Sequence, residues 1–332
     1  MTSREDESGV MPATLGPLSH RASHLPRKVI LTGGNGYVGS ELIRQMLAAG
    51  ISVYAIANNN TERLRSLLPA DSIRRIGDDF TAISIFVEEI QPDAIFHLAA
   101  IHAEPPTFDQ RMGMLKCSLL LGVALLHGAA DCANRPVFVH AGTYWQFDEG
   151  HYCPNTFYSA AKQALHDMLA YYRRAHNIPS VTLVLYDIFG PDDTRPKLWS
   201  KILQAPPGSI FPASEGRQHI EIVHVKDIAH AFIHASSLLM EGVPLEPFHA
   251  IRSGVRITLR QLLEQVKEQI ALDLTFDWGA IPYWPGQIFN PWHGPVLPGW
   301  SPTVDPVRGI AELLAAGIAL RVRPETAGSV NI

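Results

Sequence analysis

The chain has 332 residues, of which 46% are apolar, so it can bury a substantial core as one large domain or as two joined domains. Its 27 Lys and Arg residues are outnumbered by 32 Asp and Glu residues, and the formal net charge is −5. This balance excludes a bulk attraction to nucleic acid or to an anionic membrane, so any binding of phosphate must be local.

The cysteines and the N-terminal segment indicate the compartment. Cys117, Cys132 and Cys153 are odd in number and lack C-x-x-C spacing, which disfavours both a disulfide framework and a zinc site. Residues 1–26 lack the apolar core of a signal peptide, and we interpret them as a disordered leader. The apolar stretch Leu119–Leu126 is too short to span a bilayer and predicts a buried helix. We therefore expect a cytoplasmic protein without a membrane partner.

A strand, a glycine-rich turn and a helix follow one another early in the chain. The apolar run Lys28–Leu31 is typical of a buried parallel strand, and residues 40–49 carry apolar side chains at helical spacing. Between them Gly34, Gly36 and Gly39 follow the pattern G-x-G-x-x-G, which in this context brings backbone amides and a helix N-terminus to a pyrophosphate. A glycine-rich turn without a ligand is the alternative. The predicted dinucleotide contacts here are Gly33, Gly36, Tyr37, Val38 and Gly39.

The end of the second predicted strand, Ser52–Ala57, bears on the choice of cofactor. An NAD-preferring site would place an acidic residue there to bind the ribose 2′-hydroxyl. Ala57 and Asn58 occupy that region instead, so no carboxylate would repel a 2′-phosphate, and Arg63 could approach one. We therefore favour NADP(H), with NAD(H) possible and with an ordinary solvated Arg63 as the alternative.

Three further predicted strands are Ile73–Ile76, Ala94–Ala100 and Val137–His140, and helices at about 83–90 and 110–132 separate them. This alternation of strands and helices predicts an α/β fold with a Rossmann-type, doubly wound parallel sheet. Small residues at the end of the 94–100 strand leave room for a flat ring where the strand order reverses.

A candidate catalytic group follows the fifth strand. Tyr158 and Lys162 are four residues apart in a helix predicted over about 156–176, which places them on one face. Because a nearby ammonium stabilises a phenolate, we expect a lowered pKa for Tyr158 and a role as general acid or base. Thr143 would supply a second hydroxyl to the same substrate oxygen. A solvated helix face is the alternative interpretation of the Tyr-Lys pair.

Together these motifs resemble the extended short-chain dehydrogenases/reductases that act on nucleotide sugars. The resemblance covers nearly all of the chain after Arg27 and rests on residues 32–39, 77–78, 97–100, 143, 158–162, 186–191, 223–227 and 297–302. Two shorter segments, 142–146 and 192–198, are similar to 4-ketoreductases of the CDP-abequose synthase type, which act on CDP-4-keto-3,6-dideoxyhexoses.

The resemblance implies a role for each matching residue. Thr143 and Tyr158 would bind the reacting oxygen of a small-molecule nucleotide sugar, and Lys162 would hold the nicotinamide ribose. Asp78 would bond the adenine. The other implied cofactor contacts are Asp79, Leu98, Ala99, Ala100, Tyr186 and Ile188. The other implied substrate contacts are His102, Tyr144, Trp145 and Asp187.

Two departures from the family pattern concern the site. Residues 140–143 lack the serine cluster that many relatives carry before the catalytic hydroxyl. Ile220 stands where many relatives have an arginine for the diphosphate of the substrate. That charge would have to come from Arg195, Lys197 or Arg217. A substrate without a diphosphate is the alternative.

We expect two domains. Residues 27–187 and 222–250 would form the cofactor-binding domain, and residues 188–221 and 251–325 would form a smaller C-terminal substrate-binding domain. The loop-rich aromatic segment 282–302 suits a cap over the substrate, although its tryptophans could instead serve only to pack this domain.

The predicted function is NADP(H)-dependent reduction of the C4 keto group of a nucleotide-activated deoxyhexose. A 4-epimerase that retains NAD and uses the same residues is the alternative within the fold. A non-catalytic NADP-sensing regulator is the alternative from another class, but it has no chemical need for Thr143, Tyr158 and Lys162 together. No metal is expected, because the spacing of the histidines matches no metal site. The apolar helix 119–126 and the helix bearing Tyr158 could pair in a homodimer.

Overall fold

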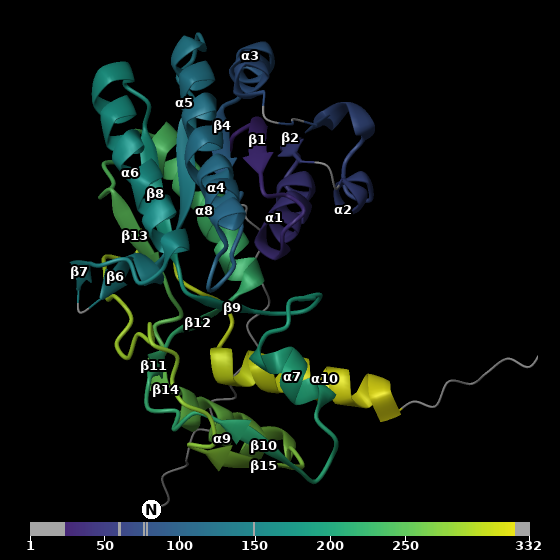
Figure 1. Ribbon diagram of the computed structural model, residues 1–332. Helices are drawn as coiled ribbons and strands as arrows, with labels where there is room; N and C mark the ends of the chain where they lie inside the picture. Colours follow the sequence, from purple (N-terminus) through teal and green to yellow (C-terminus); the bar gives the residue numbers. More distant parts are fainter. Residues whose placement is uncertain (1–23, 59–60, 76, 78, 149, 323–332) are drawn as a thin grey trace, which may run out of the picture.

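The computed structural model describes residues 24–58, 61–75, 77, 79–148 and 150–322. The larger part of the molecule is built on a sheet of seven parallel strands in the order β13-β8-β5-β4-β1-β2-β3 (Figure 1). These strands are β1 (Lys28–Thr32), β2 (Ser52–Ala57), β3 (Ile73–Arg75), β4 (Ala94–His97), β5 (Val137–Thr143), β8 (Ser180–Leu185) and β13 (Phe248–Ile251). The chain builds outward from β1 to β3 and then returns to the other side of β1, so the predicted doubly wound sheet is confirmed. The leader predicted at residues 1–26 lies almost entirely outside the described residues.

Helices cover both faces of this sheet (Figure 1). One face carries α1 (Tyr37–Ala48) and α8 (Val225–Met240), and the other carries α3 (Phe80–Ile90), α4 (Phe108–Leu115), α5 (Leu121–Asp131) and α6 (Phe157–His176). Strand β1 shows why both faces need a cover. Val29 and Leu31 belong to the core beside α1 and α8, whereas Ile30 belongs to the core beside α3, α5 and α6.

Strand β4 ends three residues earlier than the sequence predicts, because the backbone that follows it bonds to the side chain of Thr32 in β1. The Nε2–H of His97 donates to the carbonyl of Ser118 over 3.1 Å, so its Nδ1 accepts from the Thr32 hydroxyl over 2.8 Å. The same hydroxyl oxygen accepts the amide of Ala99 over 3.1 Å. Residues 98–100 therefore leave the strand and turn across the end of β1.

Helices α4 and α5 join through a π turn at Lys116–Leu120. Within the part of the chain that the structure describes, Phe108–Asp131 is the one helix long and apolar enough to cross a membrane by length and composition alone. However, α5 packs against α3 and α6, and its Leu125 and Leu126 are fully buried. This packing is that of a core helix, which agrees with the buried helix predicted around residues 119–126.

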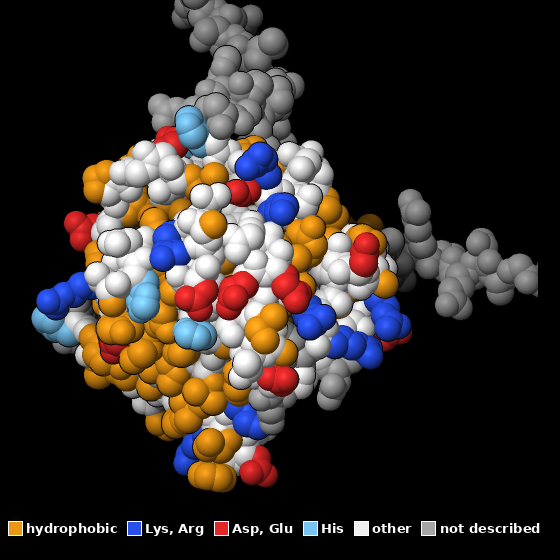
Figure 2. Space-filling model, turned by 90° about the horizontal axis from the view of Figure 1, so that it is seen from above, with side chains coloured by type: hydrophobic (Ala, Val, Ile, Leu, Met, Phe, Trp, Pro, Cys, Tyr) orange, Lys and Arg blue, Asp and Glu red, His pale blue; other side chains and the backbone are white. Residues whose placement is uncertain are grey.

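The outer side of this helical layer carries apolar side chains. Figure 2 shows hydrophobic side chains gathered on one side of the molecule. The exposed large apolar residues of α4, the π turn and α6 are Phe108, Met112, Leu120, Met168 and Tyr171.

A smaller assembly with its own apolar core lies below the sheet in Figure 1. It contains α7 (Leu198–Gln204), β10 (Ser209–Ala213), β11 (His219–Ile220), β14 (Ile257–Thr258), α9 (Leu259–Ile270), β15 (Leu274–Trp278) and α10 (Pro306–Val322). Strand β10 pairs with β15, and β11 pairs with β14. Two short strands, β9 (Asp187–Phe189) and β12 (Ile222–His224), pair where the chain passes between the two parts.

Asp227, near the start of α8, fastens the segment before α10 to the larger part. Its carboxylate accepts the Thr303 hydroxyl over 2.6 Å and the Val304 amide over 3.1 Å, and its carbonyl accepts the indole N–H of Trp300 over 3.3 Å. Because Asp227 is buried, each of these bonds satisfies a polar group that water does not reach. These bonds connect the start of α8 in the larger part to the segment that leads into α10 of the smaller assembly.

Candidate active site

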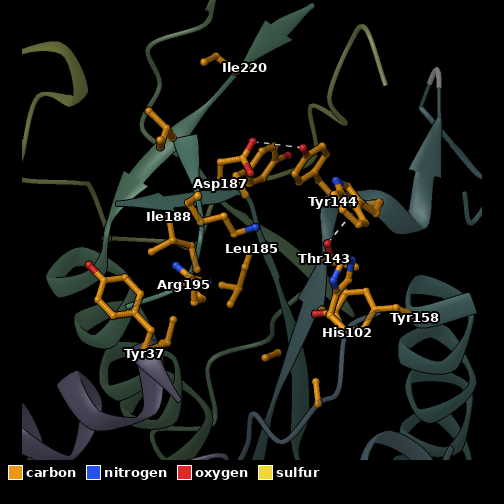
Figure 3. Close-up of a pocket in the computed structure, with 18 of the residues that line it drawn as sticks. Tyr37, His102, Thr143, Tyr144, Tyr158, Leu185, Asp187, Ile188, Arg195 and Ile220 are labelled. Atoms are coloured by element: carbon orange, nitrogen blue, oxygen red, sulfur yellow. Dashed lines mark hydrogen bonds between the residues drawn. The ribbon is translucent and has the colours of Figure 1, made fainter. Parts of the chain in front are cut away.

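A cavity of about 580 Å³ lies between the sheet and the smaller assembly (Figure 3). The predicted site residues that line it are Gly33, Gly36, Tyr37, Val38, Gly39, Leu98, Ala100, His102, Thr143, Tyr144, Trp145, Tyr158, Lys162, Tyr186, Asp187, Ile188, Arg195 and Lys197. The predicted residues that do not line it are Asn58, Arg63, Asp79, Ala99 and Arg217. Asp78 lies outside the described residues.

The glycine turn between β1 and α1 has the shape of a phosphate cradle. A Cβ on Gly39 would lie 2.2 Å from the carbonyl oxygen of Gly33, and a Cβ on Gly33, whose φ is +77°, would lie 2.8 Å from the amide of Ala99. Helix α1 begins after Gly36, which provides no side-chain cap for the first amides. This turn and the first residues of α1 line the cavity, and the positive end of the helix dipole lies there, so the turn fits the pyrophosphate of a dinucleotide.

Thr143, Tyr158 and Lys162 come together from two elements. Thr143 is the last residue of β5, which is longer than the predicted strand 137–140, and its hydroxyl oxygen accepts the amide of Trp145 over 3.4 Å. Tyr158 and Lys162 occupy the first turns of α6, which Thr156 caps through the Ser159 amide. The Thr156 cap determines where this helix starts, and thereby where Tyr158 and Lys162 lie along the cavity.

The expected lowering of the Tyr158 pKa is wrong. Protein atoms surround the phenol, and this burial raises the pKa of Tyr158 to about 12. Burial also lowers the pKa of Lys162 to about 7, with Cys117 acting in the opposite direction. The lysine Nζ lies 5.8 Å from the centroid of the tyrosine ring, and burial, not the lysine charge, is the main cause of the shift in the pKa of Tyr158. Desolvation therefore outweighs the attraction that the spacing suggested, and the Tyr158 phenol keeps its proton near neutral pH.

A row of aromatic rings forms one wall of the cavity. His102 lies edge-on to Tyr158, with ring centroids 5.5 Å apart (Figure 3). It also lies edge-on to Trp145 at 5.4 Å, and the Trp145 ring lies 5.7 Å from that of Trp284. Burial lowers the pKa of His102, so this ring is neutral at neutral pH. The wall offers mostly apolar faces to a ligand beside Tyr158.

Next to this wall are two stacked tyrosine rings, one of which bonds a carboxylate. Tyr144 stacks on Tyr186 with centroids 5.3 Å apart, and its hydroxyl donates to Asp187 over 3.2 Å (Figure 3). The hydroxyl of Tyr186 donates to the carbonyl of Trp292. Burial raises the pKa of Asp187, whereas the Lys197 ammonium acts to lower it. These bonds give the rings on this side of the cavity fixed orientations.

The three predicted cations differ in how free they are to bind an anion. Arg195 makes two 2.7 Å bonds to Asp193 and lies over the ring of Tyr37 at 4.7 Å, so its charge is compensated on the glycine-turn side (Figure 3). Arg217 pairs with Glu215 over 2.8 Å beside a separate cavity. Lys197 lines the main cavity and has no carboxylate within 4.0 Å among the described residues.

The sequence did not identify part of the lining. Trp284, Gln287 and Ile288 reach the cavity from the loop after β15, and only the abundance of aromatic residues in that loop hinted at them. Gln218 is 7% exposed, and its Oε1 has no hydrogen-bond donor within the described chain. Because Gln218 also lines the cavity, this oxygen is an acceptor available to a ligand.

Known proteins share this architecture. Residues 29–248 match the profile of the NAD dependent epimerase/dehydratase family. The chain is 28% identical over 221 residues to CDP-abequose synthase of Yersinia pseudotuberculosis, covering 63% of this chain and 73% of the relative. It is 24% identical over 304 residues to CDP-abequose synthase of Salmonella typhimurium, covering 87% and 98%. The UDP-glucose 4-epimerase of Thermus thermophilus, solved in complex with NAD, shares the fold at a TM-score of 0.69 and 24% identity, covering 91% of this chain and 100% of that chain.

The lowered pKa of Lys162 predicts a pH-dependent stability. Between about pH 7 and pH 10 the unfolded chain keeps a lysine proton that the folded protein releases, so the free energy of unfolding rises with pH by up to about 1.4 kcal/mol per pH unit. The raised pKa of Tyr158 acts in the opposite direction only above about pH 10. Urea unfolding of the unmodified protein and of Lys162→Met should therefore show the unmodified protein gaining stability relative to the variant as pH rises. A difference that does not change with pH would contradict the buried, deprotonated lysine.

Proposed function

The chain belongs to the NAD dependent epimerase/dehydratase family, and on that premise we propose that it reduces the C4 keto group of a nucleotide-activated deoxyhexose with NADP(H). The observation that carries the proposal is the meeting of Thr143, Tyr158 and Lys162 in one cavity with a glycine cradle. The similarity to two CDP-abequose synthases supports a nucleotide sugar as substrate. The cofactor-binding domain would be 27–187 and 222–250, and the substrate-binding domain 188–221 and 251–325.

The protein's part in the reaction is to place and protonate the carbonyl oxygen. When bound, the nicotinamide would supply a hydride to the carbonyl carbon. Tyr158 then gives its phenolic proton to the oxygen, since a pKa of about 12 keeps it protonated beforehand. The Thr143 oxygen already accepts the Trp145 amide, which leaves its own O–H to donate to the same carbonyl oxygen.

Lys162 would act on both the cofactor and the tyrosine. It is 1% exposed and lines the cavity one turn after Tyr158, where its ammonium would bind the nicotinamide ribose. A positive charge there also stabilises the phenolate that Tyr158 becomes after it gives up its proton. The lysine therefore lowers the energy of the charged state without forming an ion pair in the resting protein.

The rest of the cavity fits a deoxygenated sugar joined to a phosphate. The aromatic wall of His102, Trp145 and Trp284 presents apolar faces, against which a ring with few hydroxyl groups loses little hydration. Lys197 is the cation best placed for the diphosphate, because Arg195 is paired and Arg217 lies elsewhere. Ile220 also lines the cavity, where many relatives would supply an arginine.

We also propose a cytoplasmic homodimer. The exposed apolar side chains of α4, the π turn and α6 form a surface that a second copy of the chain would cover.

Cofactor turnover distinguishes the reductase from an epimerase. Purified protein mixed with NADPH and a panel of CDP-, UDP- and dTDP-linked 4-ketodeoxyhexoses should oxidise one NADPH for each sugar reduced, because a reductase releases its oxidised cofactor. Loss of nicotinamide absorbance and the mass of the product measure this ratio. Interconversion of two nucleotide hexoses without net loss of NADPH would instead identify a 4-epimerase.

Replacing the proton donor tests the mechanism. Tyr158→Phe keeps the ring but removes the acid, so we expect turnover to fall about 10²–10⁴-fold with little change in NADPH affinity. Lys162→Met should weaken cofactor binding as well as turnover. Steady-state rates and cofactor titrations measure both effects. Near-normal turnover of Tyr158→Phe would mean that the tyrosine is only part of the cavity wall.

The ribose pocket gives a test of cofactor choice. Ala57 ends β2 without a carboxylate, so the unmodified protein should bind NADPH more tightly than NADH. Ala57→Asp should shift this preference toward NADH by repelling the 2′-phosphate. Fluorescence titration of both cofactors measures the change, and tighter binding of NADH by the unmodified protein would overturn the preference.

A further inference from the structure

Three Thr-x-x-Gln capping boxes occur in the described chain, and one of them is unlike the others. In each box the glutamine Oε1 accepts the backbone amide of the threonine three residues earlier, and the distances are 2.8, 2.8 and 2.9 Å for Thr107/Gln110, Thr143/Gln146 and Thr258/Gln261. Gln110 and Gln261 are exposed, as helix caps usually are. Gln146 is 0% exposed, and the threonine that it holds is the one whose hydroxyl lines the cavity.

The direction of the bonds around Gln146 is fixed. The Thr143 amide can only donate, so it must face Oε1 of Gln146, which leaves the Nε2 of Gln146 to donate to Gln163 Oε1 over 2.8 Å. Gln163 then donates through its own Nε2 to Asp167 Oδ1 over 3.1 Å. The Asp167 carboxylate can only accept, so both glutamines accept through Oε1 and donate through Nε2, and every bond in the chain has one donor and one acceptor.

This chain of bonds joins the two elements that carry the catalytic group. Thr143 ends β5, whereas Gln163 directly follows Lys162 on α6, one turn beyond Tyr158. The intervening residues form a short hairpin of β6 (Phe147–Asp148) and β7 (His151–Tyr152). The amide bridge is therefore a direct connection between the Thr143 backbone and the helix of the other two groups.

The strand itself leaves room for the bridge. A Cβ on Gly142 would lie 2.8 Å from Gln146 Oε1 and 2.7 Å from Thr182 Cγ2. Any larger residue there would push the amide off the Thr143 N–H. Gln146 does not line the cavity, so it reaches the reacting atoms only through Thr143.

We propose that Gln146 is a positioning residue, and that its bridge to Gln163 sets the place of the Thr143 hydroxyl relative to Tyr158 and Lys162. This inference rests on the proposed function, because it assigns the bridge to the same reaction. Without Gln146 the Thr143 amide loses its acceptor, and without either glutamine the end of β5 loses this tie to α6. A displacement of about 1 Å at a catalytic group can reduce turnover about 10²-fold.

Kinetics of Gln146→Met, Gln163→Met and the double variant test the bridge. Methionine keeps the length of the side chain and removes both hydrogen-bonding groups. We expect each single change to lower kcat about 10–10²-fold while KM stays within about threefold, and the double variant to be no slower than the worse single one. Gln110→Met breaks an equivalent but exposed cap and should leave kcat unchanged. Losses that multiply in the double variant, or full kcat in both single variants, would overturn the proposal.

Hydrogen exchange gives a second readout that does not need the reaction. In Gln163→Met the Thr143 amide keeps its acceptor but loses the tie to α6, so it should exchange faster than in the unmodified protein. This variant also decides the matter if Gln146→Met does not fold, since Gln163 is only half-buried. Unchanged exchange would overturn the positioning role. Failure of the unmodified protein to oxidise NADPH would count against the proposed function alone, because the exchange result stands without it.

Discussion

The site depends on the parallel register of β1, β4 and β5, which places three polar side chains in one row at the end of the sheet. Thr32 pairs with His97 in this register, and His97 pairs with His140. The two histidine rings stack with centroids 5.7 Å apart. Burial, helped by the charge of Lys162, lowers the pKa of His97 to about 3 and holds that of His140 well below its usual range. The row is therefore uncharged, so it adds no positive charge beside the buried lysine.

Desolvation determines the charge states of Tyr158 and Lys162. Burial moves the pKa of Tyr158 upward and that of Lys162 downward, so both changes favour the uncharged form. A phenol that keeps its proton suits the donation of that proton in a reduction. A lysine with a pKa near neutrality can gain charge when a negative group arrives beside it. At neutral pH the tyrosine is therefore uncharged and the lysine is only partly charged, which limits the cost of burying the two groups.

The sequence predicted a strand, helix or turn well where a short local pattern of residues determines it. The alternation of apolar strands and helices was enough for the doubly wound sheet, and the glycine spacing was enough for the turn before α1. The spacing of Tyr158 and Lys162 gave their shared face but not the sign of the pKa shift, because burial depends on distant residues. The end of β4 was also predicted wrongly, because the Thr32 side chain, distant in sequence, bonds the Ala99 amide. Arg217 was predicted at the site, but it pairs with Glu215 away from the cavity. The sequence did not predict Gln218 and Trp284 as cavity residues, because loops of the smaller assembly place them there only in the folded chain.

The smaller assembly takes its residues from two separate lengths of chain, and this affects how the protein can fold during synthesis. The sheet has all seven strands once residue 251 has left the ribosome. At that point the core of the smaller assembly, on the other side of the cavity, is incomplete because it lacks α10, which packs on α7 and α9. Between the synthesis of residue 251 and that of α10, therefore, the nascent chain presents a complete set of sheet strands beside an apolar surface that is not yet covered. An apolar surface exposed in that interval favours aggregation of the nascent chain.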